Sequence, residues 1–169
     1  MNPITLYTAA CRGEVGNTVY PEKRIITNTD QFKAAMAFDH VGAEYKDFYR
    51  KNENYITSDC LMMDCDNDHS DRPGDWVSPE IIRDSMPGLP FYVCFSRHNY
   101  KIKKGKSPRP RFHVYFAIEP VTDYAEYRRF KENVISQFPQ FYFDKGAKDA
   151  ARFFFGVSNP QVMLMGGEV

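Results

Sequence analysis

The sequence predicts a single domain of the α+β, or mixed α/β, class. The 169 residues have the length of one domain, and 43% of them are hydrophobic, so a stable core can form. Helical and strand-like segments follow one another irregularly, unlike the regular alternation of a doubly wound parallel sheet. Two apolar runs, 91-FYVCFS-96 and 111-RFHVYFAI-118, flank one polar loop and are expected to pair as antiparallel strands.

Four helices are expected from capping residues and apolar periodicity. They cover about residues 30–39, 43–50, 79–86 and 123–138. The predicted N-caps are Asn28 or Thr29 for the first helix, Ser78 for the third, and Thr122 or Asp123 for the last. The predicted inward-facing residues are Phe32, Ala35 and Met36 in the first helix and Tyr127, Phe130 and Val134 in the last.

Short apolar runs predict four strands, at residues 60–65, 91–96, 111–118 and 152–157. The N-terminal stretch, residues 3–26, is expected to contain loop and strand. Its turn signals are Gly13, Gly16-Asn17 and Pro21.

Composition excludes several classes of protein. No apolar run is long enough to span a membrane, and the N-terminus lacks a signal-peptide pattern. The cysteines show no CxxC spacing and have no paired histidines nearby, so we expect neither a zinc site nor a disulfide framework. These residues, expected to be reduced thiols, are Cys11, Cys60, Cys65 and Cys94.

A net charge of zero conceals an uneven distribution. The loop at residues 97–111 holds seven lysines and arginines and no acid. Because 22 basic and 22 acidic residues balance over the whole chain, the remainder carries an excess of seven negative charges. Basic residues beside an aromatic such as Tyr100 suit a flap that binds phosphate or a single-stranded template, and a solvated loop is the alternative. A basic loop and an acidic cluster in one domain suit a site where metal and phosphate meet.

An acidic motif follows an apolar run in 61-LMMDCD-66. Because side chains alternate along a strand, Asp64 and Asp66 share one face, with their Cα atoms roughly 6.6 Å apart. Two carboxylates on one face can bridge one or two hard cations. The alternative is an acidic turn after a strand. The flanking loops are expected to hold Asp59, Asp68 and Asp71.

A second polar face lies on the strand at residues 111–118. Arg111, His113 and Tyr115 share this face. The opposite face, which is expected in the core, holds Phe112, Val114 and Phe116. A histidine beside an arginine suits contact with a triphosphate, whereas an incidental surface histidine is the alternative.

A third acidic segment, 141-FYFDKGAKDAARFFFG-156, follows the last predicted helix. Asp144 comes directly after an aromatic run, Asp149 lies five residues later, and Arg152 opens the last predicted strand. Either aspartate can complete a cage of three carboxylates around a metal, and the arginine can pair with phosphate oxygens.

In this order, the three motifs resemble those of the archaeo-eukaryotic primase superfamily, in the primase-polymerase branch of plasmids, phages and integrative elements. That family has DxD or DxE on a strand, small-x-His on a later strand and a hydrophobic-Asp pair near a final strand. The matching segments are 64-DCD-66, 111-RFH-113 and 143-FD-144, with arginine where the family often has serine. The segments most similar to bacterial mobile-element primases are 38-FDHVGAEYKDFYRKNENYI-56, 64-DCDNDHSD-71 and 149-DAARFFFG-156, and the resemblance covers about residues 28–156.

The resemblance implies an antiparallel catalytic sheet like that of RNA-recognition (RRM) folds, packed with helices and joined to a smaller N-terminal α/β unit. It also implies template-directed nucleotidyl transfer with two Mg²⁺ or Mn²⁺ ions, a nucleoside triphosphate (NTP or dNTP), and a single-stranded DNA template with its primer. On this reading, Asp64 and Asp66 bridge both metals. Asp144 holds the metal that activates the 3′-hydroxyl, with Asp149 as its rival, and His113 stabilises the phosphates.

The resemblance and the charge pattern together assign further binding residues. The expected nucleotide-binding residues are Ser96, Lys103, Lys104, Arg111, His113 and Arg152. The expected nucleic-acid-binding residues are Arg97, Tyr100, Lys101, Lys106 and Arg109.

Mobile-element members of the family are usually longer and carry a helicase domain after the primase. This chain stops at 165-MGGEV-169, so residues 1–169 are expected to be the N-terminal catalytic domain of a longer primase-helicase in the bacterial cytoplasm. Two other functions suit the same residues: a non-catalytic module that binds single strands, and a metal-dependent nuclease.

Overall fold

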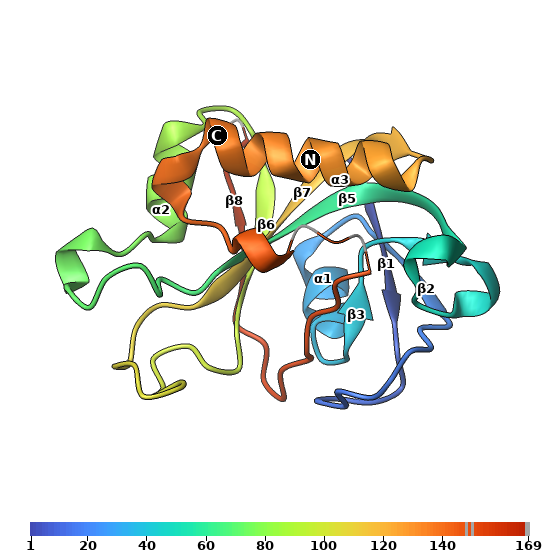
Figure 1. Cartoon of the computed structure of the whole chain (residues 1–169), viewed down its shortest axis with the longest axis horizontal. Helices are drawn as coiled ribbons and strands as arrows, with labels where there is room; N and C mark the ends of the chain where they lie inside the picture. Colours follow the sequence, from blue (N-terminus) through green and yellow to red (C-terminus); the bar gives the residue numbers. More distant parts are fainter. Residues whose placement is uncertain (148, 150, 168–169) are drawn as a thin grey trace.

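The chain folds around two antiparallel β-sheets. The computed structural model describes residues 1–147, 149 and 151–167. A three-stranded sheet has the order β2-β1-β3, and a five-stranded sheet has the order β4-β5-β7-β6-β8. Three α-helices pack on these sheets (Figure 1), which confirms the predicted α+β class.

The smaller sheet belongs to an N-terminal α/β unit. Its strands are β1 (Ile4–Thr8), β2 (Glu22–Ile26) and β3 (His40–Val41), and its helix is α1 (Thr29–Ala35). The side chain of Asn28 caps α1 by accepting a hydrogen bond from the backbone N–H of Gln31. The predicted inner face is confirmed, because Phe32, Ala35 and Met36 are fully buried.

The central sheet is antiparallel throughout. Its strands are β4 (Glu44–Tyr45), β5 (Tyr55–Cys65), β6 (Phe91–Phe95), β7 (Phe112–Val121) and β8 (Val162–Met165). β6 and β7 pair antiparallel across the basic loop, as predicted. β5 and β7 are the longest strands and lie next to each other at the middle of the sheet.

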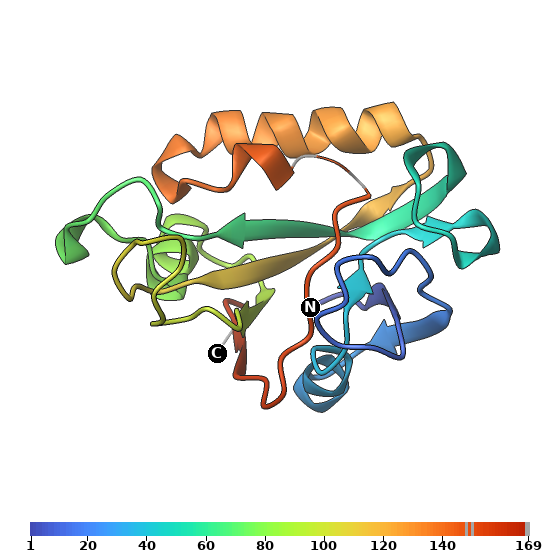
Figure 2. The same ribbon diagram turned by 60° about the horizontal axis from the view of Figure 1, so that its bottom comes forward.

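Each face of the central sheet has its own core. One face packs against α2 (Pro79–Ser85) and α3 (Tyr124–Gln137), with Leu61, Met63 and Cys65 of β5 in this core. The other face packs against α1 and β1 through Met62 and Tyr115. Figures 1 and 2 show α3 running along β5 on one side and the N-terminal unit on the other. The predicted alternation of side chains in both strands is therefore confirmed.

Five short 3-10 helices connect these elements in the described part of the chain. They are Lys46–Phe48, Asn52–Asn54, Pro73–Asp75, Pro139–Phe141 and Lys145–Ala147. No helix among the described residues has the length and apolar character needed to cross a membrane.

The helix predicted over residues 43–50 is wrong. Tyr45 lies in β4, pairs with Tyr55 of β5 and buries its ring. Asp47 and Phe48 then take φ angles of 55° and 56°, which an α-helix does not contain. Sheet pairing by the aromatic residues therefore outweighs the local helical pattern.

The strand predicted over residues 152–157 is also wrong, because the last strand is β8. Phe154 forms only an isolated bridge with His40. Gly156 lies against the backbone of Phe38, where an added Cβ would be 2.6 Å from the carbonyl carbon. This segment therefore packs against the N-terminal unit instead of adding a strand to the central sheet.

The inward face of α3 differs from the prediction in one position. Phe130 is 37% exposed, whereas its neighbour Lys131 is buried. The Lys131 ammonium donates a hydrogen bond of 2.6 Å to the carbonyl of Ala147, and burial lowers the pKa of Lys131 from 10.5 to about 8. The buried face of α3 is thus shifted by about one residue from the face that the apolar periodicity predicted.

Buried Asp39 holds several loops of the N-terminal unit together. Its carboxylate accepts hydrogen bonds from the backbone N–H groups of Gly13, Glu14 and Gly156, at 2.8, 2.9 and 2.7 Å. These groups come from segments more than a hundred residues apart in the sequence. Charge-assisted bonds of this kind are the strong ones, so Asp39 fixes the last aromatic segment against α1.

A buried histidine joins the N-terminal unit to the central sheet. Nε2 of His40 lies 2.7 Å from the hydroxyl of Tyr115, and Nδ1 lies 2.9 Å from the carbonyl oxygen of Phe38. Burial lowers the pKa of His40 from 6.5 to about 4, although the Phe38 carbonyl and Asp39 act in the opposite direction. His40 is therefore neutral in the folded protein at pH 7.

We expect His40 to lower the stability of the protein as the pH falls from about 6.5 to about 4. Above this range the imidazole is neutral in both the folded and the unfolded chain. Within it, the unfolded chain binds a proton that the folded chain does not. The contribution of His40 to the free energy of unfolding should therefore be about 2 kcal/mol lower at pH 5 than at pH 8.

Urea unfolding of the wild type and His40→Gln at both pH values measures this contribution. Other titrating groups act in both chains, so the difference between the two pH dependences isolates His40. The wild type should lose about 2 kcal/mol relative to the variant between pH 8 and pH 5. An identical pH dependence in the two chains would contradict the prediction.

Candidate active site

The strand register places the first and second motifs side by side. Asp64 near the end of β5 is the direct partner of His113 in β7. Nε2 of the histidine lies 3.6 Å from Oδ1 of the aspartate. Both side chains are on the face that the N-terminal unit covers, one step beyond Met62 and Tyr115, so they line the edge of that interface.

Asp66 follows the end of β5 and is surrounded by positive charge. The ammonium of Lys103 in the basic loop lies 2.5 Å from Oδ2. Nε of Arg111 lies 3.6 Å from Oδ1. The aspartate side chain is 20% exposed, so it remains open to the cleft.

Asp144 reaches the first motif at a free strand edge. β4 pairs only with the beginning of β5, so the end of β5 has an unpaired edge on that side. There, the backbone N–H of Asp144 donates a hydrogen bond of 2.9 Å to the carbonyl of Asp64. Its carboxylate accepts a bond from the N–H of Gly146 and lies 3.8 Å from the guanidinium of Arg152.

Asp149, the rival third ligand, is turned toward other partners. Its carboxylate accepts hydrogen bonds from the hydroxyl of Tyr124 at 3.2 Å and from the side chain of Asn52 at 3.4 Å. It also accepts a bond from the backbone N–H of Ala151. These contacts tie the segment to α3 and to the 3-10 helix Asn52–Asn54, so Asp149 has an evident structural role.

The carboxylates of the first and third motifs interact electrostatically. Burial, together with the nearby charges of Asp66 and Asp144, raises the pKa of Asp64 from 3.8 to about 7. Lys103 and Arg152 act in the opposite direction. Carboxylates held this close repel one another, and a bound cation would relieve that repulsion.

His113 is a neutral hydrogen-bonding group. Its ring stacks on Phe154, with centroids 3.8 Å apart and planes inclined by 11°. Burial lowers its pKa well below 6.5, and the positive charges around it act in the same direction. Phe154 was predicted only as part of the strand at residues 152–157. The aromatic run did not indicate which ring would support the histidine.

Asp64, Asp66 and His113 face a cleft of about 610 Å³, and Asp144 lies outside its lining. The cleft brings together eight of the predicted residues: Asp64, Asp66, Ser96, Arg97, Lys103, Lys104, His113 and Arg152. Its remaining walls are Val15, His98, Ile102 and Phe153 to Phe155. The guanidinium of Arg97 lies 3.8 Å from the centre of the Phe155 ring, which fixes one basic group at the rim.

Two predicted ligand-binding arginines have an internal role instead. Arg109 and Arg111 are fully buried. Arg109 donates to the carbonyls of Asn67 and Ser70 and pairs with Asp71 at 2.6 Å. Arg109 was predicted to bind nucleic acid and Arg111 to bind nucleotide, with a solvated loop as the alternative, but a guanidinium with five donors can satisfy several loop carbonyls at once.

Three other predicted residues lie outside the lining of the cleft. Tyr100 is 61% exposed on the basic loop, and Lys101 is exposed beside it. Lys106 donates to the carbonyl of Asp68 at 2.7 Å and lines a separate groove with His69 and Ser107. These side chains are therefore available only to a ligand that extends beyond the cleft.

The donor chemistry of the motif residues fits a hard divalent cation. The aspartates at positions 64, 66 and 144 offer carboxylate oxygens, which Mg²⁺ and Mn²⁺ prefer. No group of three or more His, Cys, Asp or Glu side chains is already arranged around a metal position among the described residues. To hold an ion, the carboxylates would have to rotate toward one another, and Lys103 would have to leave Asp66.

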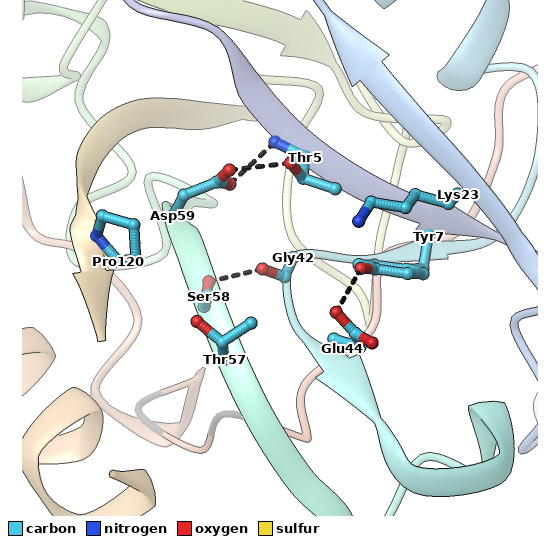
Figure 3. A pocket seen from close by; sticks show the side chains of 9 residues that line it. All are labelled: Thr5, Tyr7, Lys23, Gly42, Glu44, Thr57, Ser58, Asp59 and Pro120. Carbon is cyan, nitrogen blue, oxygen red and sulfur yellow. Dashed lines mark hydrogen bonds between the residues drawn. The ribbon is translucent and has the colours of Figure 1, made fainter. Parts of the chain in front are cut away.

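A second cavity, of about 140 Å³, lies near the beginning of β5 (Figure 3). There, Asp59 accepts hydrogen bonds of 2.7 Å from the backbone N–H and from the hydroxyl of Thr5. Tyr7 donates a bond of 2.8 Å to Glu44. These pairs hold the two sheets together, and the cavity is lined by none of the predicted site residues.

The fold is similar to that of a solved viral domain. This domain is the AEP domain of the primase-polymerase (PrimPol) of cyanophage S-2L. The TM-score is 0.51, the match covers 98% of this chain and 83% of that chain, and the sequence identity is 12%. No family model and no curated protein matches the sequence. The chain thus has a fold like that of an archaeo-eukaryotic primase domain, as the order of its motifs predicts.

Proposed function

We propose that this chain is the catalytic domain of a template-directed nucleotidyltransferase, a DNA primase-polymerase. One observation carries the proposal: residues of three motifs, Asp64 and Asp66, His113, and Asp144, lie around one end of β5. A basic loop borders the same cleft. This combination suits a reaction in which an anionic triphosphate meets carboxylate-bound cations.

The three aspartates are the proposed ligands of two Mg²⁺ or Mn²⁺ ions. When bound, these ions would neutralise the triphosphate and favour deprotonation of the attacking 3′-hydroxyl. Asp64, Asp66 and Asp144 would supply the carboxylates that hold these ions. Arg152 lies 3.8 Å from Asp144, so it can orient this carboxylate and remain within reach of a phosphate.

Other side chains of the cleft bind and orient the nucleotide. His113 is neutral, so its imidazole has one N–H group, which can donate a hydrogen bond to a phosphate oxygen. The Phe154 ring beneath it restricts its orientation. Ser96, Lys103 and Lys104 also line the cleft and contribute a hydroxyl and two ammonium groups. Fixed donors of this kind stabilise charge that develops on the leaving pyrophosphate.

Template and primer are proposed to follow the basic loop. Arg97, Tyr100 and Lys101 offer two positive charges and an exposed aromatic ring. Such groups bind the phosphates and stack on the bases of single strands with little regard to sequence. We therefore expect affinity for single-stranded DNA to fall steeply as salt is added.

The biological setting is proposed from the sequence resemblance. We infer replication of a mobile element in the bacterial cytoplasm, with this domain at the N-terminus of a longer protein that also carries a helicase.

One assay tests the proposed function against its two rivals. Primed and unprimed labelled DNA templates are incubated with Mn²⁺ or Mg²⁺, with and without nucleoside triphosphates. We expect longer products that require both metal and nucleotide. Shorter products without nucleotide would indicate a nuclease, and salt-sensitive binding without any change in length would indicate a non-catalytic module.

A further inference from the structure

The ammonium group of a lysine in the basic loop contacts the carboxylate of a proposed metal ligand. The Lys103 ammonium lies 2.5 Å from Oδ2 of Asp66, and both side chains are largely buried, at 23% and 20% exposed. Lys103 also lowers the pKa of Asp64, so its charge reaches both carboxylates of the first motif. A divalent cation at Asp66 and an ammonium in contact with the same oxygens would repel each other. The lysine and the metal therefore compete for one carboxylate.

The base of the basic loop is firmly attached to the rest of the protein. Arg111 is fully buried and donates a hydrogen bond of 3.0 Å to the carbonyl of Lys101. The carbonyl of buried Arg109 accepts a bond of 2.9 Å from the backbone N–H of Tyr100. Displacing this part of the loop would leave buried polar groups without partners, which is costly.

The loop tip, residues 102–106, is held by fewer contacts. Lys103 and Lys106 exchange two backbone hydrogen bonds across a tight turn in which Lys104 and Gly105 have positive φ. Ile102 is 71% exposed. Among the described residues, the polar contacts that join this tip to the rest of the chain are Lys103 with Asp66 and Lys106 with Asp68. Once Lys103 leaves Asp66, Lys106 with Asp68 is the remaining polar contact of the described residues that supports this turn, so the backbone bonds of the tip can open while its base stays fixed.

We propose that the loop tip is a latch that a divalent cation opens. Before metal binds, Lys103 neutralises Asp66 and limits its repulsion with Asp64. When a cation binds Asp66, the ammonium leaves this carboxylate, the tip separates from the first motif, and Lys103 becomes free to meet an anion in the cleft. Metal occupancy is thereby coupled to the position of the loop. This inference rests on the proposed function, because it takes Asp66 to be a metal ligand.

Metal affinity in the absence of nucleotide tests the competition. Free Mn²⁺ is measured by electron paramagnetic resonance during titration of the wild type, Lys103→Gln and Lys104→Gln. Lys104 is a matched control, because it lies next to Lys103 in the same tip and its removal deletes the same charge. We expect Lys103→Gln to bind Mn²⁺ about five- to tenfold more tightly than the wild type, and Lys104→Gln to stay within about twofold of it.

Hydrogen exchange of the tip tests the movement. With saturating Mn²⁺ and no nucleotide, the amides of Lys103 and Lys106 in the wild type should exchange at least about fivefold faster than without metal. In Lys103→Gln the position-103 and Lys106 amides should exchange fast under both conditions. In Asp66→Asn the metal should leave the exchange rate of the tip unchanged.

The outcomes separate the latch from the function on which it rests. If Mn²⁺ binds the wild type and Lys103→Gln equally, or binds without accelerating exchange in the tip, the latch is overturned. In that case, a wild type that still extends primers leaves the proposed function in place. If Mn²⁺ binds neither chain, both proposals fail.

Discussion

Replacing Asp64 with asparagine is expected to reduce nucleotide incorporation by about a hundred- to a thousandfold. Asp64 lies opposite His113 in the sheet, and its backbone carbonyl accepts a hydrogen bond from the N–H of Asp144, so it touches both other motifs. Its carboxylate is the most central of the three proposed metal ligands. Asparagine keeps the shape and one oxygen but removes the negative charge that a divalent cation requires. Primer extension in Mn²⁺ measures the effect.

Stability is expected to stay the same or to increase in Asp64→Asn. The carboxylate is 7% exposed and lies near Asp66 and Asp144, which raise its pKa. Removing a buried charge that is repelled by its neighbours does not weaken the fold. Thermal unfolding therefore separates loss of chemistry from loss of structure.

Asp84→Asn is the matched control for this substitution. Asp84 is exposed on α2 and pairs with Arg83, far along the chain from any motif. The same chemical change at this position should leave primer extension within about twofold of the wild type. Full extension by a folded Asp64→Asn protein would overturn the proposed mechanism.

Much of the sheet could be predicted because its residues obey simple alternation. Leu61, Met63 and Cys65 enter one core while Met62 and Asp64 turn to the other face, as a period of two requires. Capping by Ser78 was equally visible, because serine followed by proline and an acid is a strong local signal. These features depend on neighbours within a few residues.

The errors arose where distant contacts outweigh local patterns. Tyr45 enters the sheet because Tyr55, ten residues later, pairs with it. The segment 152–157 leaves the sheet because Asp39 and Phe38 hold its backbone. Neither partner can be identified from the composition of the segment itself, so a single sequence favours the wrong element at both places.

The motif residues of the candidate site could be predicted from the sequence. The residues that support them could not. The aspartates and His113 follow from spacing on strands, but Phe154 under the histidine depends on how the last segment crosses the N-terminal unit. The buried arginines show the same limit. A run of basic residues does not reveal which members turn inward, and Arg109 and Arg111 do so because they find unpaired loop carbonyls.

The two candidates for the third metal ligand are expected to respond in opposite ways to substitution by alanine. Asp144→Ala should reduce primer extension by about a hundredfold, because Asp144 is bonded to Asp64 at the cleft. Its stability should change little, since its carboxylate is half-exposed and holds few groups. Asp149→Ala should retain extension within about threefold of the wild type but unfold about 1–3 kcal/mol more easily.

The reason for this contrast lies in the partners of each carboxylate. Asp149 accepts hydrogen bonds from Tyr124 and Asn52 and from the backbone of Ala151, so its loss leaves three donors unpaired. Asp144 faces Arg152 and lies near enough to Asp64 to raise its pKa. Urea unfolding and primer extension of both variants, measured side by side, distinguish the two roles. If Asp149→Ala abolishes extension while Asp144→Ala retains it, the third ligand is Asp149 and the loop must rearrange when metal binds.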